Sequence, residues 1–210
     1  GGQYLVPPGP PVALHGNVPA IDPGAAGYAY QQWRSDFLVD CGNGLWRVAS
    51  QGDNTYSEAI GYGMLISAAF DDRVAFDGLW SYYQAGVEPS TGLMHWRVSG
   101  CQAAASGTGA ATDADLDVAM ALIHAYCRGW GEPYRTDAVR MIETIRVQET
   151  LSGYLPDGQL GYYLKPGPRW GGADCMNPSY FAPGYYRVFE TFAPADGFWI
   201  ELAEGSYQLL

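Results

Sequence analysis

The chain has 210 residues, with 11 basic and 22 acidic side chains and a formal net charge of −11 at pH 7. Hydrophobic residues make up 48% of it, which excludes a disordered chain. The negative charge argues against nucleic acid and against an anionic membrane as partner, because both require a basic surface. No stretch approaches the roughly 20 apolar residues of a membrane-spanning helix.

Tryptophan and tyrosine are abundant, with 7 and 16 residues, while charged residues make up only 16%. Uncharged aromatic faces suit flat, uncharged ligands, of which sugars are the first to consider. The 28 glycines and 14 prolines indicate long loops between the regular elements.

The hydrophobic pattern predicts an all-α chain of about seven paired helices, as in a toroid or a bundle. An extended leader rich in proline and glycine is expected over residues 1–22. Short strand-like segments are expected at 45–49 and 93–98, and a long loop rich in glycine and tyrosine at 151–177. The predicted helices cover residues 23–39, 58–70, 74–83, 113–128, 136–150, 178–192 and 195–210.

Three aspartates cluster at the start of the helix predicted over 113–128. The helical spacing places Asp113 and Asp117 on one face and points Asp115 elsewhere. One side chain suffices for a cap, so three acids suggest a carboxylate held at the floor of a cleft. A calcium loop would need glycine where Val118 stands, and no metal site is predicted.

Glu58 is expected in the first turn of the second helix, which Ser57 could cap. A carboxyl group beside apolar residues is suited to donate a proton. The alternative is a glutamate that only complements the helix dipole, and the spacing alone leaves both open.

Two aromatic residues, Trp170 and Tyr180, lie in or beside loops rich in glycine and proline. Such loops usually run over the surface, so either ring could be a stacking platform for a sugar. Either could equally be an anchor that fixes its loop to the core.

The four cysteines form no CxxC motif, which argues against a structural zinc site. Cys41 and Cys101 lie in glycine-rich loops bordering the segments of Glu58 and Asp113, so we expect them close together. They form either a disulfide of an exported protein or a pair of reduced thiols. Cys127 follows the helical pattern and is expected to be a buried free thiol.

Taken together and in this order, several motifs resemble glycoside hydrolase family 8, the bacterial endoglucanases, chitosanases, lichenases and related xylanases. The resemblance runs from about residue 27 to the end. It rests on Ser57-Glu58 with Gly61-Tyr62-Gly63-Met64, Phe76-Asp77-Gly78-Leu79-Trp80, Gly92-Leu93-Met94-His95-Trp96, Ala111-Thr112-Asp113-Ala114-Asp115, and Arg169-Trp170-Gly171-Gly172 with Asn177-Pro178-Ser179-Tyr180-Phe181-Ala182-Pro183.

The resemblance implies an (α/α)6 toroid of six inner and six outer helices that hydrolyses a β-1,4-glycosidic bond with inversion. It implies that Glu58 is the general acid and that Asp113 lies at the subsite where the sugar ring distorts. The same comparison makes Trp96, Trp170 and Tyr180 sugar platforms, and Asp115, in the aspartate motif, a substrate-binding residue.

Residues 23–210 would then be the N-terminal two-thirds of the catalytic domain, truncated before the aspartate that usually serves as general base. We expect an endo-β-1,4-glucanase acting on internal bonds of a β-1,4-linked polysaccharide, secreted by a bacterium, without a cofactor. A chitosanase, lichenase or xylanase of the same family, or a non-catalytic glycan-binding remnant, are the alternatives.

Overall fold

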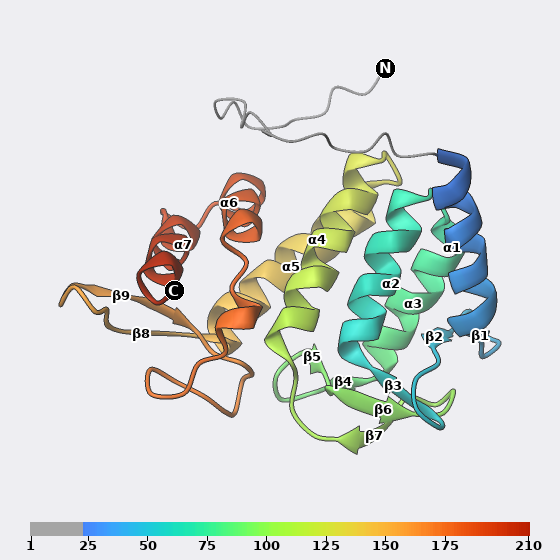
Figure 1. The fold of residues 1–210 in the computed structure, drawn as a ribbon, viewed down its shortest axis with the longest axis horizontal. Coiled ribbons are helices and arrows are strands. Elements are labelled where there is room, and N and C mark those ends of the chain that lie inside the picture. The colour runs from blue at the N-terminus through green and yellow to red at the C-terminus, as the bar shows by residue number, and fades with distance from the viewer. Residues whose placement is uncertain (1–22) are drawn as a thin grey trace.

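The computed structural model describes residues 23–210, so the predicted leader over 1–22 lies outside the described residues. The described chain forms seven α-helices, the number that the sequence predicts, with short strands at one end (Figure 1). A closed (α/α)6 toroid has twelve helices, so the seven helices of the described residues form only part of one. The helices are α1 Pro23–Phe37, α2 Ser57–Ala69, α3 Arg73–Ala85, α4 Thr112–Cys127, α5 Glu132–Gln148, α6 Pro183–Phe192 and α7 Phe198–Gln208.

The core is built around α4, which packs against α2 on one side and α5 on the other. Nearly every residue from Ala114 to Ala125 is buried. Ile60 and Met64 of α2 fill one side of α4. The sequence predicts α4 more clearly than any other helix. Apolar residues fill almost all of its sides because nearly all of them are buried.

The turn between α2 and α3 is fixed by Asp72, which lies between the helices predicted over 58–70 and 74–83. Its Oδ1 accepts a hydrogen bond from the backbone N–H of Ala75 at 3.0 Å and so caps α3. Its Oδ2 accepts from the Tyr30 hydroxyl at 2.8 Å and from Arg34 Nε at 2.9 Å, both on α1. The carboxylate of Asp72 therefore caps the start of α3 and also binds α1 to the α2–α3 turn.

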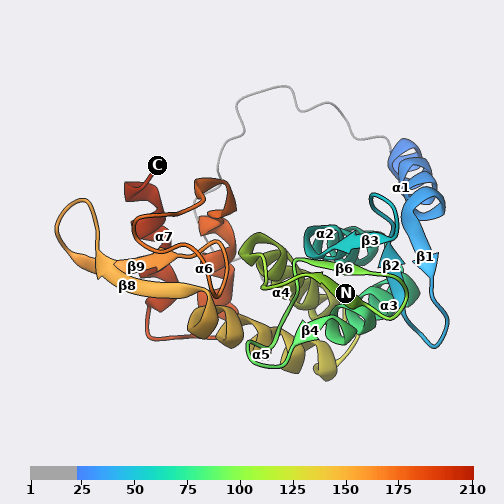
Figure 2. The ribbon, with the colours of Figure 1, turned by 90° about the horizontal axis from the view of Figure 1, so that it is seen from below.

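Within residues 23–210, nine strands of two to five residues form four small antiparallel sheets, where the sequence predicts only strand-like segments at 45–49 and 93–98. Strands this short carry too few residues to show an alternating pattern. Seven of them lie together at one end of the α1–α5 helices (Figures 1 and 2). They are β1 Leu38–Asp40, β2 Trp46–Val48, β3 Asn54–Tyr56, β4 Val87–Glu88, β5 Leu93–Met94, β6 Arg97–Ser99 and β7 Ala104–Gly107.

The loop predicted over 151–177 is wrong in its first half. Strands β8 (Thr150–Tyr154) and β9 (Leu160–Leu164) form an antiparallel hairpin. Its turn contains Asp157-Gly158, a common hairpin signal, and Gly158 has a φ of 82°. The glycine and tyrosine content that suggested a loop instead belongs to a hairpin packed against α7.

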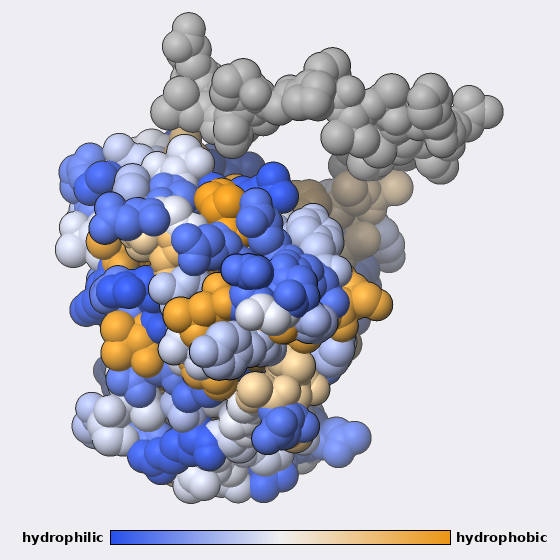
Figure 3. Space-filling model, turned by 90° about the vertical axis from the view of Figure 1, so that its left-hand side faces the viewer, coloured by the Kyte–Doolittle hydropathy of each residue, from blue (hydrophilic) through white to orange (hydrophobic). Residues whose placement is uncertain are grey.

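Near the C-terminal end, the observed helix boundaries also differ from the predicted ones. The helix predicted over 178–192 is a short 3-10 turn, Pro178–Tyr180, followed by α6 from Pro183. Proline fits the first turn of a helix but not its interior, which explains the division. The outer face beside α7 and the hairpin shows separate apolar patches among hydrophilic surface (Figure 3).

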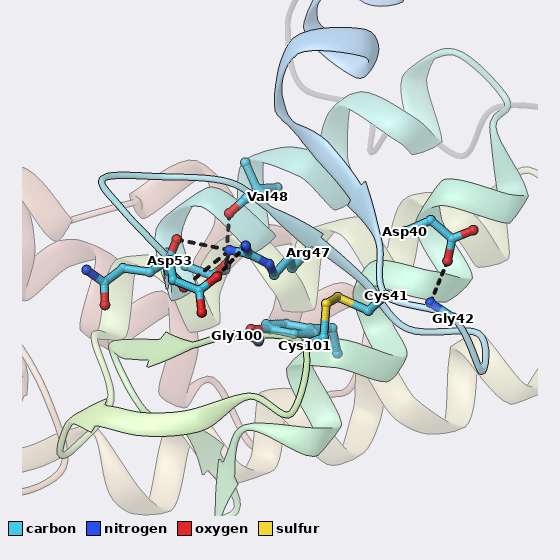
Figure 4. The surroundings of a disulfide bond; sticks show 11 residues. Asp40, Cys41, Gly42, Arg47, Val48, Asp53, Gly100 and Cys101 are labelled. Atoms are coloured by element: carbon cyan, nitrogen blue, oxygen red, sulfur yellow. Dashed lines mark hydrogen bonds and ion pairs between the residues drawn. A yellow bond between two sulfur atoms is a disulfide. The ribbon is translucent and has the colours of Figure 1, made fainter.

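A disulfide joins Cys41 to Cys101, which confirms that these two residues lie together (Figure 4). Their Cα atoms are 5.2 Å apart, and the bond ties the β1–β2 turn to the loop between β6 and β7. Beside it, Arg47 donates to Asp53 Oδ1 at 2.7 Å (Figure 4). Cys127 is free but exposed, so the prediction that it is buried is wrong: it occupies the last position of α4, beyond the packed part.

Candidate active site

Glu58 is half-buried in the first turn of α2. The start of this helix is tied to the strands, since the buried Ser57 donates its backbone N–H to the Trp96 carbonyl at 3.0 Å. Ser57 is not the predicted cap: its hydroxyl donates to Glu58 Oε2 at 3.3 Å, and Tyr56 occupies the cap position. The hydrogen bond helps to orient the carboxyl group of Glu58.

Asp113 lies in the first turn of α4 and is half-buried. Burial, and then the nearby charge of Glu58, raise the pKa of Asp113 to about 6. Its Oδ1 is buried and has no hydrogen-bond partner among the described residues. The structure thus brings the two predicted catalytic carboxyl groups near each other from positions 55 residues apart in sequence.

A cavity of about 230 Å³ opens beside Asp113. Asp117 also lines it, as the helical spacing predicts, and its Oδ1 accepts from the Tyr185 hydroxyl at 3.1 Å. Burial raises the pKa of Tyr180, and the nearby charges of Asp113 and Glu58 raise it further. The lining residues are Tyr62, Asp113, Leu116, Asp117, Ser179, Tyr180, Phe181, Ala182 and Tyr185.

A second hollow of about 420 Å³ lies between α1 and the α2–α3 turn. It contains none of the predicted site residues. The smaller cavity, with its paired acids and tyrosines, is the one whose chemistry fits a site.

Trp170 is 48% exposed, which favours a platform over an anchor. Its loop is held firmly: Lys165 Nζ donates to the Pro168 carbonyl at 2.7 Å, and Arg169 pairs with Glu88 at 2.5 Å. The indole lies over Gly167, where an added Cβ would come within 2.2 Å of Trp170 Nε1. Glycine at 167 is therefore what permits the ring position.

Trp96 is half-buried and more constrained. Its ring stacks on Tyr56 with centroids 5.9 Å apart, and the Arg97 guanidinium lies 4.7 Å from its centroid. Gly107 packs so closely that a Cβ there would come within 2.5 Å of the ring. Three neighbouring residues of the protein therefore already contact the ring of Trp96.

Asp115 does not bind substrate in the way that the sequence predicts. Its side chain is fully buried, and its Oδ1 accepts a short hydrogen bond from the Tyr83 hydroxyl. Because Asp115 points away from the face shared by Asp113 and Asp117, it lies beneath the site rather than in it.

Sequence reasoning did not single out Tyr62 and Tyr185. Tyr62 follows Glu58 by four residues on α2, so helical spacing could have found it. Tyr185 comes from α6, distant in sequence, and only the fold brings it to Asp117.

Within residues 23–210, no helix is long and apolar enough to cross a membrane. In the same range, no group of three or more His, Cys, Asp or Glu side chains could hold a metal ion.

The comparisons with known proteins agree with the resemblance. The model of the glycosyl hydrolases family 8 matches residues 18–210, and the chain belongs to that family. Endoglucanase 2 of Ruminiclostridium josui is 38% identical over 190 residues, covering 86% of this chain. Endoglucanase A of Acetivibrio thermocellus is 35% identical over 188 residues, again covering 86% of this chain.

Solved structures support the fold. The endo-β-1,4-glucanase CMCax of Acetobacter xylinum superimposes with a TM-score of 0.76 at 25% identity, over 90% of this chain. The β-1,3-1,4-glucanase of Paenibacillus sp. X4 gives 0.76 at 24% identity, over 89%. The chain spans 39% of the length of the R. josui enzyme and 58% of the A. xylinum chain.

Proposed function

We propose that the whole protein is an endo-β-1,4-glucanase that acts by inverting hydrolysis. The observation that carries the proposal is the pairing of Glu58 and Asp113 beside a cavity lined by Tyr62 and Tyr180. The endoglucanase names of relatives 35–38% identical to this chain support the choice of glucan.

In this mechanism Glu58 donates its proton to the glycosidic oxygen as the bond to C1 breaks. A water molecule attacks C1 from the opposite face, and a second carboxylate takes its proton, so one water is added and the configuration at C1 inverts. Inverting enzymes hold the two carboxyl groups roughly 6.5–9.5 Å apart to leave room for that water. Asp113 would contact the sugar ring at the cleavage point.

The resemblance implies that the second carboxylate is an aspartate outside this chain. We propose that residues 23–210 supply the acid and part of the sugar-binding surface. This proposal is tested by comparing reducing-sugar release by this chain with release by a version extended to the length of its relatives. Equal rates would overturn it and would point to Asp113 as the base.

The test of the acid is Glu58→Gln in the extended protein, because glutamine keeps the shape and removes the proton. Turnover of a β-1,4-glucan should fall by about 10²–10⁴-fold, the usual contribution of general acid catalysis, while binding stays nearly unchanged. Glu132→Gln, an exposed glutamate on α5, is the matched control. A loss below tenfold would remove Glu58 from this role.

Cellulose, lichenan, xylan and chitosan should be compared as substrates. Preference for chitosan or xylan would identify the corresponding alternative, and binding without product release would identify a glycan-binding protein.

We also propose secretion to an oxidising compartment. The Cys41–Cys101 disulfide supports it, since such bonds persist mainly outside the cytosol. Cell fractionation of the natural host tests it, and recovery of the protein in the cytosol would contradict it.

A further inference from the structure

A pair of buried acids lies beneath the candidate site. Asp115 is on α4, and Glu149 directly follows the last residue of α5. Both side chains have no exposed surface. Since a buried carboxylate without a compensating partner is costly, each oxygen of the pair needs a donor.

Donors are missing. The Tyr83 hydroxyl donates to Asp115 Oδ1, but no donor among the described residues makes a hydrogen bond of normal geometry to Asp115 Oδ2 or to either carboxyl oxygen of Glu149. The Thr112 hydroxyl lies near enough to lower the pKa of Glu149, but its proton is donated to the Lys165 carbonyl at 2.8 Å. Burial raises the pKa of Asp115, and the neighbouring charge of Glu149 raises it further, so the two side chains lie close to each other. An ionised carboxylate only accepts, whereas a protonated one also donates. A proton held between the two acids would supply the missing donor.

Burial favours keeping that proton, whereas the Thr112 hydroxyl and the charge of Lys165 lower the pKa of Glu149 and oppose it. Four groups face the pair: the Tyr83 hydroxyl from α3, Thr112 and Asp113 from α4, and Lys165 from the segment after β9. Lys165 is the one cation that they include, and its Nζ is engaged by the Pro168 carbonyl. Burial raises the pKa of Glu149 to about 8 and raises that of Asp115 as well.

The pair lies where three elements of the candidate site meet. Tyr83 accepts a hydrogen bond from the backbone N–H of Met94 at 3.2 Å, two residues before Trp96. The Glu149 carbonyl accepts from the Lys165 N–H at 2.8 Å, at the start of the loop that carries Trp170.

Thr112, next to Asp113, closes the connection by donating its hydroxyl to the Lys165 carbonyl at 2.8 Å. The strand before Trp96, the start of α4 and the loop of Trp170 are therefore joined by hydrogen bonds around the acid pair.

We propose that Asp115 and Glu149 share one proton. We further propose that this buried acid pair fixes the positions of Asp113 and of the loop of Trp170 relative to each other. Only the roles of Asp113 and Trp170 rest on the proposed function. The acid pair itself can be tested in the chain without any sugar.

The first test is the pH dependence of stability. A buried acid whose pKa is raised on folding binds its proton more tightly when folded, so its contribution to stability falls as pH rises from its ordinary value of 4.5 to about 8. The decline is at most tenfold in the folding equilibrium constant per pH unit. Glutamine mimics the protonated acid, so Glu149→Gln should lack this decline, and Glu132→Gln should keep it.

Urea unfolding at pH 5 to 9 measures the three profiles. Parallel profiles for the wild-type chain and Glu149→Gln would overturn proton sharing. A carbonyl band of a protonated carboxylic acid at pH 7, absent from Glu149→Gln, is the expected infrared signature, and its absence from the wild-type chain would also overturn it.

The second test addresses positioning. Hydrogen exchange, corrected for its intrinsic pH dependence, should show that residues 110–115 and 165–170 lose protection in the wild-type chain between pH 7 and pH 9. Glu149→Gln should keep their protection at both pH values. Equal behaviour of the two proteins would overturn the positioning role. If the exchange pattern is as expected but oligosaccharide binding is lost, the result would instead count against the proposed function alone.

Discussion

Gly61 on α2 lies directly against Asp117 on α4: a Cβ added to Gly61 would stand 2.9 Å from the Asp117 Cβ and 3.1 Å from the Ala114 carbonyl oxygen. Real Cβ atoms essentially never approach so closely. The absent side chain allows the two helices to pack closely, and this packing brings Glu58 near Asp113.

Gly61→Ala should therefore push the helices apart. We expect a loss of about 1–3 kcal/mol in the free energy of unfolding, the usual cost of overpacking, measured by urea denaturation. Gly184→Ala on α6 is the control, because nothing lies within 4 Å of an added Cβ there. Equal stability of the two variants would contradict the close packing.

The titration of Asp113 should depend on Glu58. Burial is the larger cause of its raised pKa of about 6, and the charge of Glu58 is the second. In Glu58→Gln the pKa of Asp113 should fall toward its ordinary 3.8 without reaching it, followed by NMR of the side-chain carboxyl carbon. An unchanged pKa would mean that the two acids do not interact.

The raised pKa of Asp113 also predicts how the stability of the chain changes with pH. Because the folded pKa of Asp113 is raised, its contribution to stability declines as pH rises from 3.8 to about 6. Asp113→Asn should flatten that part of the pH profile of unfolding, and Glu132→Gln should not. A decline of the same size in all three proteins would rule out Asp113 as its source.

Trp170→Ala should weaken oligosaccharide binding more than folding, since nearly half of this side chain is exposed. Stacking on a sugar requires the flat ring, so Trp170→Phe should retain part of the binding. Calorimetry and thermal melts on the same preparations separate the two effects. A stability loss of about 3–5 kcal/mol, as for a core tryptophan, would make Trp170 a packing residue.

Loss of the disulfide should destabilise the chain. Cys41 and Cys101 are 60 residues apart, and a bond closing a loop of this length typically contributes about 2–5 kcal/mol. Cys41→Ser should lower the free energy of unfolding by that amount, and Cys175→Ser, at an exposed free cysteine, should change it little. Unfolding in urea without reductant measures both, and similar values would indicate that the bond contributes nothing.

Local signals in the sequence determined the seven helices, the face shared by Asp113 and Asp117, and the break at Asp72, because helical periodicity and capping depend on residues a few positions apart. The hairpin of β8 and β9 differs from the predicted loop although its Asp157-Gly158 turn is a local signal, because a segment this rich in glycine and tyrosine resembles a loop in composition.

The chain's motifs also identified the family, and the resemblance predicts that Glu58 and Asp113 are its catalytic pair. Only the tertiary structure decided that Asp115 is buried beneath the site, that Tyr185 reaches Asp117, and that Glu149 lies against Asp115. The two contacts join residues 34 and 68 positions apart that come from different elements of the fold. Local periodicity carries no information on such distances; burial and helix packing fix them.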